Sequence, residues 1–291
     1  MKILSYNILS GGFNSYNYES PTPERLGLLE KVIHIIHADF VGLIDTFRWD
    51  SLYSNDQLCQ IFGYKNAYCI NLNDERLKKK GHSTGITVLT NLPVESFETI
   101  SLGTRDAIKT DIRINNNKLD IFTVYLDDLD EDTRIGQINA LLSQRQDSST
   151  IIMGDLNTLS PDEATRLTPL INKFFTEHPN LSESFMPVLD EMKRGEVTRI
   201  LERHRFLDAD KNGTPTAPSK LFPVRIESAL FRVDYAFHTK DIQISNFKVP
   251  KDSILDQTSD HYPIVFEVDI KNKNRTVVLN EHDLGLDKQV F

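Results

Sequence analysis

The chain has 291 residues, of which 39% are hydrophobic and 26% charged, so it is long enough to bury a large core. Its formal net charge of −9 disfavours a protein that holds nucleic acid through its own basic surface. An enzyme that brings a divalent cation to a phosphate remains compatible with an acidic composition. The two cysteines, Cys59 and Cys69, exclude a disulfide framework, and we expect reduced core thiols.

The sequence after Met1 lacks a basic stretch followed by an apolar one, and no apolar run is long enough to cross a bilayer. We therefore expect a cytoplasmic protein without a transmembrane segment.

Short apolar runs bounded by turn residues predict eight strands. In chain order they cover residues 2–9, 40–44, 85–89, 109–114, 119–126, 150–153, 233–237 and 264–270. The asparagines at 115–117 predict a hairpin, and Gly154 is expected to end the strand at 150–153. The polar tail 272–291 contains one further candidate strand at 276–279.

Helical spacing of apolar residues predicts helices at 25–38 and 134–142. Residues 160–206 are predicted to be mostly helical, beginning with Ser160 as N-cap, Pro161 in the first turn and Glu163 in a capping box. No low-complexity linker interrupts the chain. We therefore expect one α/β domain over 1–291, with strands in two layers and a helical insertion at about 160–206.

Polar residues that suit metal and phosphate chemistry form four clusters at the ends of predicted strands. Asn7 offers a carbonyl oxygen to a metal and an amide to a phosphate, although such an asparagine alone is more often a turn former. Asp45 directly follows the apolar run 40–44, where a hard-cation ligand would be well placed. The alternative for Asp45 is an ordinary turn or N-cap residue.

The third cluster, Asp155 and Asn157, is more specific. The two residues are two positions apart, so on extended backbone their side chains would point the same way. Gly154 would let the backbone approach a neighbour closely. A carboxylate beside an amide can orient and deprotonate a water molecule.

The fourth cluster consists of Asp260 and His261, with Asp234 upstream. Asp234 could accept a hydrogen bond from one ring nitrogen of His261, which would fix the tautomer and raise the pKa of the imidazole. A lone histidine is more often structural, but the neighbouring carboxylates favour a functional role here.

This ordered set of residues resembles the endonuclease/exonuclease/phosphatase superfamily of deoxyribonuclease I-like enzymes over about residues 2–269. The motifs that carry the resemblance are Asn7, Asp45, Gly154-Asp155-x-Asn157, Asp234 and Ser259-Asp260-His261-x-Pro263. The resemblance implies a four-layered α/β sandwich, in which helices flank two central mixed β-sheets and the site lies at one rim. It also implies hydrolysis of a phosphoester with Mg²⁺ or Mn²⁺ as cofactor.

Two positions depart from the family pattern. The second cluster usually ends in Gln-Glu, with the glutamate as main metal ligand, whereas this chain has Ile44-Asp45, one methylene shorter. On the middle strand many members have Asn-Thr-His-Leu, whereas here the run ends in Tyr125-Leu126, similar to the abasic-site endonucleases. The alternative for Tyr125 is a half-buried strand aromatic.

The resemblance implies two groups of site residues. The metal would be held by Asp45, Asn7 and Asp260. Water and phosphate would be handled by Asp155, Asn157, His261, Asp234 and Tyr125.

The acidic composition favours a small or lipid-derived phosphoester as substrate. A DNA or RNA nuclease is the enzymatic alternative, favoured by Tyr125. A binding protein that keeps the fold without catalysis is the second alternative, and Asp45 is the feature in its favour.

Overall fold

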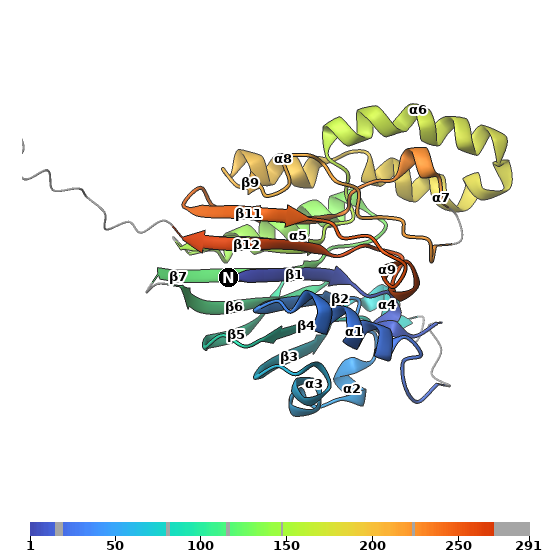
Figure 1. The fold of residues 1–291 in the computed structure, drawn as a ribbon. Helices are drawn as coiled ribbons and strands as arrows, with labels where there is room; N and C mark the ends of the chain where they lie inside the picture. The colour runs from blue at the N-terminus through green and yellow to red at the C-terminus, as the bar shows by residue number, and fades with distance from the viewer. Residues whose placement is uncertain (15–19, 80–81, 115–116, 147, 223–224, 271–291) are drawn as a thin grey trace, which may run out of the picture.

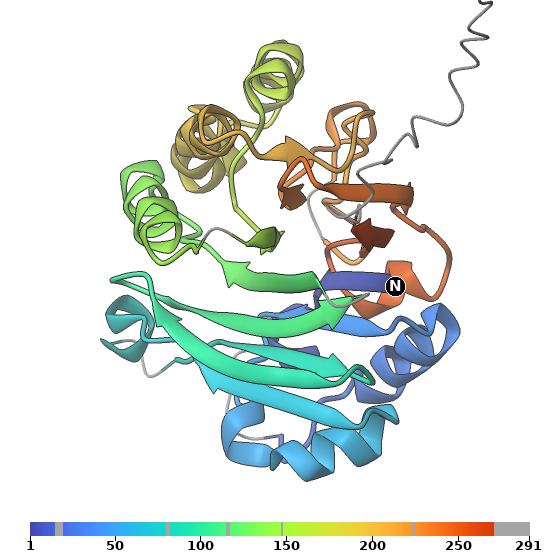
Figure 2. The same cartoon turned by 90° about the vertical axis from the view of Figure 1, so that its left-hand side faces the viewer.

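The computed structural model describes residues 1–14, 20–79, 82–114, 117–146, 148–222 and 225–270. Within these ranges two mixed β-sheets lie face to face, and helices cover their outer faces (Figures 1 and 2). The four-layered α/β sandwich expected from the sequence is therefore confirmed. Of the helices in these ranges, none has the length and apolar character needed to span a membrane.

Each sheet has six strands among the described residues. The first sheet has the order β11 (Ile242–Lys248), β12 (Ile264–Ile270), β1 (Lys2–Asn7), β2 (Phe40–Ile44), β4 (Gly85–Thr90) and β3 (Asn66–Asn71). The second has the order β5 (Val94–Ser101), β6 (Asp106–Ile114), β7 (Asn117–Tyr125), β8 (Ser149–Asp155), β10 (Asp234–His238) and β9 (Leu207–Asp208). Strands β1 and β2 are parallel, as are β7 and β8, so each pair brings two carboxyl ends to one edge.

Helices pack against both sheets. On the first sheet lie α1 (Leu26–Ile36) and α3 (Asn55–Phe62), and on the second lie α5 (Glu131–Ser143) and α8 (Glu196–Arg203). Three short helices, α2 (Trp49–Leu52), α4 (Glu75–Lys79) and α9 (Leu255–Thr258), and the 3₁₀ turns η1 (Ser10–Gly12) and η2 (Glu227–Ala229) lie in the connections. Cys59 and Cys69 are both free thiols and partly buried.

The two sheets share one apolar core, to which Ile3 and Phe40 contribute from the first sheet and Ile121 and Met153 from the second. The sheets approach closely at Gly42 of β2, where an added Cβ would lie 2.8 Å from the Met153 side chain. This close approach brings the carboxyl ends of β1 and β2 within reach of those of β7 and β8.

All eight predicted strands are present, but four strands were missed. These are β3, β5, β9 and β11, which are the outermost strands of the two sheets. The prediction that Gly154 ends a strand is wrong, because β8 continues to Asp155, which pairs with strands on both sides. Residues 115–116 of the predicted hairpin turn and the tail 271–291, with its candidate strand at 276–279, lie outside the described residues.

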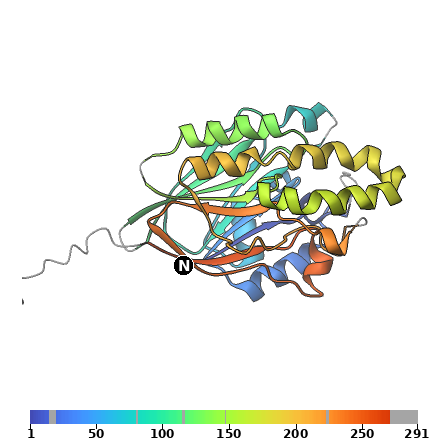
Figure 3. The same ribbon diagram turned by 90° about the horizontal axis from the view of Figure 1, so that it is seen from above.

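The stretch 160–206 holds α6 (Pro161–Glu177), α7 (Pro179–Met192) and α8. The predicted capping box is confirmed: the Glu163 backbone N–H donates to Ser160 Oγ at 3.3 Å, and the Ser160 N–H donates to the Glu163 carboxylate at 3.4 Å. Helices α6 and α7 extend past the strand ends on the side where β1 finishes (Figures 1 and 3). That residues 1–291 form a single domain with an insertion here stays a prediction.

Gly154 controls the position of β8. Its φ is +142°, and a Cβ added there would lie 2.0 Å from the backbone oxygen of Val124. Only glycine tolerates this conformation and this contact without strain.

We predict that Gly154→Ala lowers the free energy of unfolding by about 3 kcal/mol or more, through backbone strain and overpacking. Gly136→Ala is the matched control, because Gly136 lies inside α5 with no atom within 4 Å of the added Cβ. The control should raise the free energy of unfolding by about 0.5–1 kcal/mol. Urea unfolding monitored by circular dichroism measures both, and equal effects of the two substitutions would contradict the prediction.

Candidate active site

A pocket of about 430 Å³ opens at the rim where the four carboxyl strand ends meet. Seven of the eight predicted site residues line it: Asn7, Asp45, Tyr125, Asp155, Asn157, Asp260 and His261. Asp234, the eighth, lies directly behind His261. The fold thus brings together all the residues that the sequence motifs identified.

Strand pairing sets the spacing of the groups on the second sheet. Tyr125 ends β7 and pairs with Asp155 at the end of β8, which in turn pairs with Asp234 at the start of β10. On the first sheet, Asn7 at the end of β1 pairs with Ile44, directly before Asp45. Two short rows of polar side chains therefore face one pocket from opposite sheets.

Asp155 links the two rows. Its Oδ2 accepts a hydrogen bond from Asn7 Nδ2 at 2.9 Å, and its Oδ1 accepts one from the Asn157 backbone N–H at 2.9 Å. Burial and the negative charge of Asp234 raise the pKa of Asp155 to about 7, against the opposing effect of His261. A carboxylate of this pKa is suited to take up a proton near neutral pH.

Asn157 does not adopt the extended backbone that the sequence predicted. The strand ends at Asp155, and Asn157 has a φ of +50°. Its side-chain amide donates to the backbone oxygen of Leu126 at 3.0 Å instead of pointing alongside the Asp155 carboxylate. Asn157 therefore orients Asp155 through its backbone N–H and joins the ends of β7 and β8.

His261 forms the expected hydrogen bond with Asp234, with 2.8 Å between Nδ1 and Oδ2. Burial alone would lower the pKa of His261, but the charges of Asp234 and Asp260 outweigh it and raise the pKa to about 10. At neutral pH the ring is therefore an imidazolium. Since Asp234 occupies Nδ1, Nε2 remains as a donor to an anionic group in the pocket.

Ser259 and Arg25 hold the loops of the site together. Ser259 Oγ donates to the Asn7 backbone oxygen at 2.6 Å and accepts from the His261 backbone N–H at 3.2 Å. The buried Arg25 guanidinium donates to the backbone oxygens of Leu9, at 2.7 Å, and of Thr258. Sequence reasoning missed Arg25, because nothing local to residue 25 indicates contacts with a loop more than 200 residues away.

The oxygen donors on the first sheet suit a hard divalent cation. Asp45 has a φ of +59°, and its carboxylate accepts hydrogen bonds from Ser10 N–H and Thr84 Oγ, each at 2.6 Å. Burial and the negative charge of Asp45 raise the pKa of Asp260. Two carboxylates that repel one another beside the carbonyl oxygen of Asn7 form a donor set that fits Mg²⁺ or Mn²⁺. Thr84 was not identified from the sequence.

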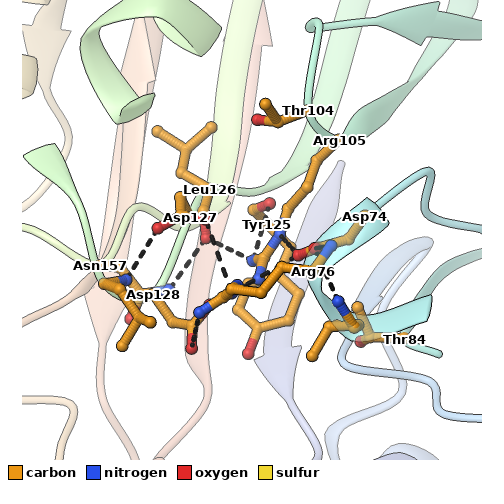
Figure 4. Close-up of polar contacts among 12 residues, drawn as sticks. Asp74, Arg76, Thr84, Thr104, Arg105, Tyr125, Leu126, Asp127, Asp128 and Asn157 are labelled. Atoms are coloured by element: carbon orange, nitrogen blue, oxygen red, sulfur yellow. Dashed lines mark hydrogen bonds and ion pairs between the residues drawn. The ribbon is translucent and has the colours of Figure 1, made fainter. Parts of the chain in front are cut away.

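A second acidic cluster lies beside Tyr125 (Figure 4). The Arg105 guanidinium stacks on the Tyr125 ring at 4.5 Å from its centroid, and it donates to Asp74 at 3.0 Å and to Asp128 at 2.6 Å. Arg76 also pairs with Asp128. Two arginines thus balance this cluster and fix the Tyr125 ring, a role that sequence reasoning did not assign to Arg105.

A sequence profile described as the Endonuclease/Exonuclease/phosphatase family matches residues 4–261. The chain belongs to the endonuclease/exonuclease/phosphatase family. The resemblance seen in the sequence motifs is therefore confirmed. Among curated proteins, none matches the chain in sequence.

Solved structures of this family are similar to the chain in fold. An AP endonuclease from Archaeoglobus fulgidus is 15% identical, with a TM-score of 0.62, 93% of this chain covered and 100% of that one. The human Nocturnin catalytic domain with bound sulfate is 14% identical, with a TM-score of 0.60 and 93% of each chain covered. A mannosyl-6-phosphatase from Bacteroides thetaiotaomicron is 14% identical, with a TM-score of 0.55, 93% of this chain covered and 100% of that one.

The raised pKa of His261 leads to a prediction for the metal-free protein. Because the folded-state pKa of about 10 exceeds the ordinary histidine pKa of 6.5, the imidazolium stabilises the fold below pH 6.5. That contribution is lost as the pH rises towards 10. Asp234→Asn should lower the pKa of His261 by about 1–3 units, since it removes an adjacent opposite charge.

An NMR titration of the imidazole carbons in the presence of a chelator measures this shift. His238 is the internal control, because its ring bonds to the Thr239 backbone oxygen and burial lowers its pKa. Its titration should not change with Asp234→Asn. A His261 pKa near 6.5 in both proteins would rule out the proposed charge pairing.

Proposed function

We propose that the chain is a metal-dependent phosphoesterase that hydrolyses a phosphodiester or a phosphomonoester by in-line attack of water. The observation that carries the proposal is the Asp155 carboxyl, with a pKa of about 7, beside the hydrogen-bonded pair of His261 and Asp234 in one pocket. This arrangement combines a base near neutrality with a fixed cationic donor.

In this proposal Asp155 orients the attacking water and takes its proton. Asn7 and Asn157 hold the two carboxylate oxygens in place through their N–H groups. His261 donates from Nε2 to a phosphoryl oxygen as negative charge increases, and Asp234 fixes its orientation. The Tyr125 hydroxyl is a further donor, held by the stacked Arg105.

A divalent metal would be held by Asp45, Asp260 and Asn7, and it would supply positive charge to a phosphoryl oxygen and to the leaving group. The donor set of carboxylate and carbonyl oxygens supports Mg²⁺ or Mn²⁺. Asp45 is shorter than the glutamate usual in the family, but the hydrogen bonds from Ser10 and Thr84 hold its carboxylate at the pocket.

The charge of the pocket favours a substrate with one phosphate, small or derived from a lipid. Among the described residues that line the pocket, the ionisable ones are four aspartates, one histidine and Tyr125. None of these lining residues is a lysine or an arginine. Polyanionic substrates need several cationic contacts. A DNA or RNA nuclease is the second candidate, favoured by Tyr125 at the pocket. A cytoplasmic location stays a prediction.

We predict that Asp155→Ala and His261→Gln each lower kcat about 10²- to 10⁴-fold, because each removes one proton-transfer or hydrogen-bonding group. Asp162→Ala, at an exposed position of α6, is the control and should leave kcat unchanged. The measurement uses a phosphoester panel with Mg²⁺ or Mn²⁺, containing abasic DNA, plasmid DNA, sphingomyelin, inositol phosphates and a chromogenic diester. Full activity of both variants on every active substrate would disprove the site assignment.

The same panel separates the two candidate functions. A nuclease should lose affinity for DNA steeply between 50 and 200 mM salt, about 10³-fold or more for six or more phosphate contacts, whereas turnover of a small diester should change little.

We further predict that Mg²⁺ and Mn²⁺ bind at or below millimolar concentration and that Asp45→Asn weakens binding about tenfold or more, since one negative ligand is lost. Calorimetric titration measures both affinities. The control is Asp50→Asn, which neutralises an exposed aspartate on α2 and should bind metal normally. If the parent protein binds neither metal at millimolar concentration, the non-catalytic binding protein becomes the better interpretation.

A further inference from the structure

The pocket has two unlike ends. The polar end is formed by the strand-end residues already described. The remaining wall is mostly apolar and comes from α6, α7 and residues 217–222 and 226–233. Among its residues are Phe175, Phe185, Leu189, Phe222, Ile226 and Phe231. We refer to these six side chains as the apolar wall.

Helix α7 contributes to this wall with a face that packs against a hydrophobic cluster of α6 and α7 but stays partly exposed to the pocket. Phe185, Val188, Leu189 and Met192 recur at helical spacing and all line the pocket. A surface helix usually buries such a stripe against the core. Here Met192 is the one fully buried residue of the described α7, and the other three are half-buried. The apolar face of α7 is therefore turned to the pocket.

Three aromatic rings connect the parts of the wall. The ring of Phe185 on α7 stacks with that of Phe175 on α6, with 6.5 Å between centroids. Phe185 also meets Phe222 of the loop edge-on, with 6.1 Å between centroids. Phe185 is thus the central ring of three connected aromatic side chains, which line the same pocket as the candidate catalytic groups.

The charged groups of the pocket lie away from this surface, and Ser184 is the one polar side chain that α7 adds to the described lining. The ionisable residues among its described lining, apart from Tyr125, are Asp45, Asp128, Asp155, Asp260 and His261, all at the strand-end side or next to it. Asp128 is already paired with two arginines. A hydrocarbon group gains most from such a wall, because each buried methylene is favourable without needing a hydrogen-bond partner.

We propose that the apolar wall binds the hydrocarbon chain of the substrate, so that the enzyme selects a phosphoester with a single alkyl or acyl chain. The inference rests on the proposed function, since the phosphate must lie at Asp155 and His261 for the chain to reach Phe185. A pocket of about 430 Å³ lies within the usual range for small ligands, about 300–1,000 Å³, and accommodates one chain beside the phosphate.

The test is a series of p-nitrophenyl alkyl phosphodiesters with methyl, butyl and octyl groups. The value of kcat/KM should rise about fourfold for each methylene that the wall buries. Phe185→Asn should flatten this dependence on chain length. Phe174→Asn is the matched control. It also replaces a phenylalanine by asparagine, on the neighbouring helix α6, but Phe174 does not line the pocket. That variant should retain the full dependence on chain length.

Binding gives a second readout that does not depend on turnover. Calorimetry with Mg²⁺ should show that octylphosphonate binds the parent protein at least about tenfold more tightly than methylphosphonate. Phe185→Asn should remove most of this preference, and Phe174→Asn should keep it.

The outcomes separate this inference from the proposed function. If the methyl diester is hydrolysed but chain length and Phe185→Asn have no effect, the apolar-chain site is wrong and the phosphoesterase stands. If no ester is hydrolysed but octylphosphonate binds preferentially through Phe185, the phosphoesterase is wrong and the apolar-chain site stands. If chain length has no effect and Phe185→Asn instead dissociates a dimer in light scattering, the wall is an interface between copies and the inference fails.

Discussion

The pairing of β8 with β7 and β10 is the constraint on which the site depends. It places Tyr125, Asp155 and Asp234 in one row, and Gly154 permits it by letting the backbone approach Val124. The hydrogen bond from Asn7 to Asp155 then joins this row to the first sheet. The reacting groups are thus held by backbone ladders of both sheets, which position side chains more rigidly than loops do.

Crowding of carboxylates gives the site its chemistry and also destabilises it. Burial and the charge of Asp234 raise the pKa of Asp155, and burial and the charge of Asp45 raise that of Asp260. His261 offsets part of this repulsion as an imidazolium. The remaining repulsion is what a divalent cation would relieve. In the proposed function, the same arrangement that costs folding free energy would provide a base near neutral pH and an affinity for metal.

The sequence identified the strands that are mostly buried. The eight central strands hold apolar residues that the fold largely covers, whereas outermost strands such as Val94–Ser101 carry exposed polar residues that hide the pattern. Site residues were found where they follow a strand. Arg25, Thr84 and Arg105 were not identified, because their hydrogen-bonding partners lie far away in the chain. The extended backbone predicted for Asn157 was wrong, because no pattern in the sequence indicated its positive φ.

The direction of the apolar face of α7 is a second property that no local pattern encodes. Helical spacing shows that Phe185, Leu189 and Met192 share one face, but only the fold shows that this face, besides packing on the core, also borders the pocket. Because the described lining carries no lysine or arginine, the proposed function requires a substrate to bind mainly through His261, a bound metal and apolar burial. Apolar burial is not screened by salt, so this pocket is better suited to a hydrophobic phosphoester than to a polyanion, whose binding depends on counterion release.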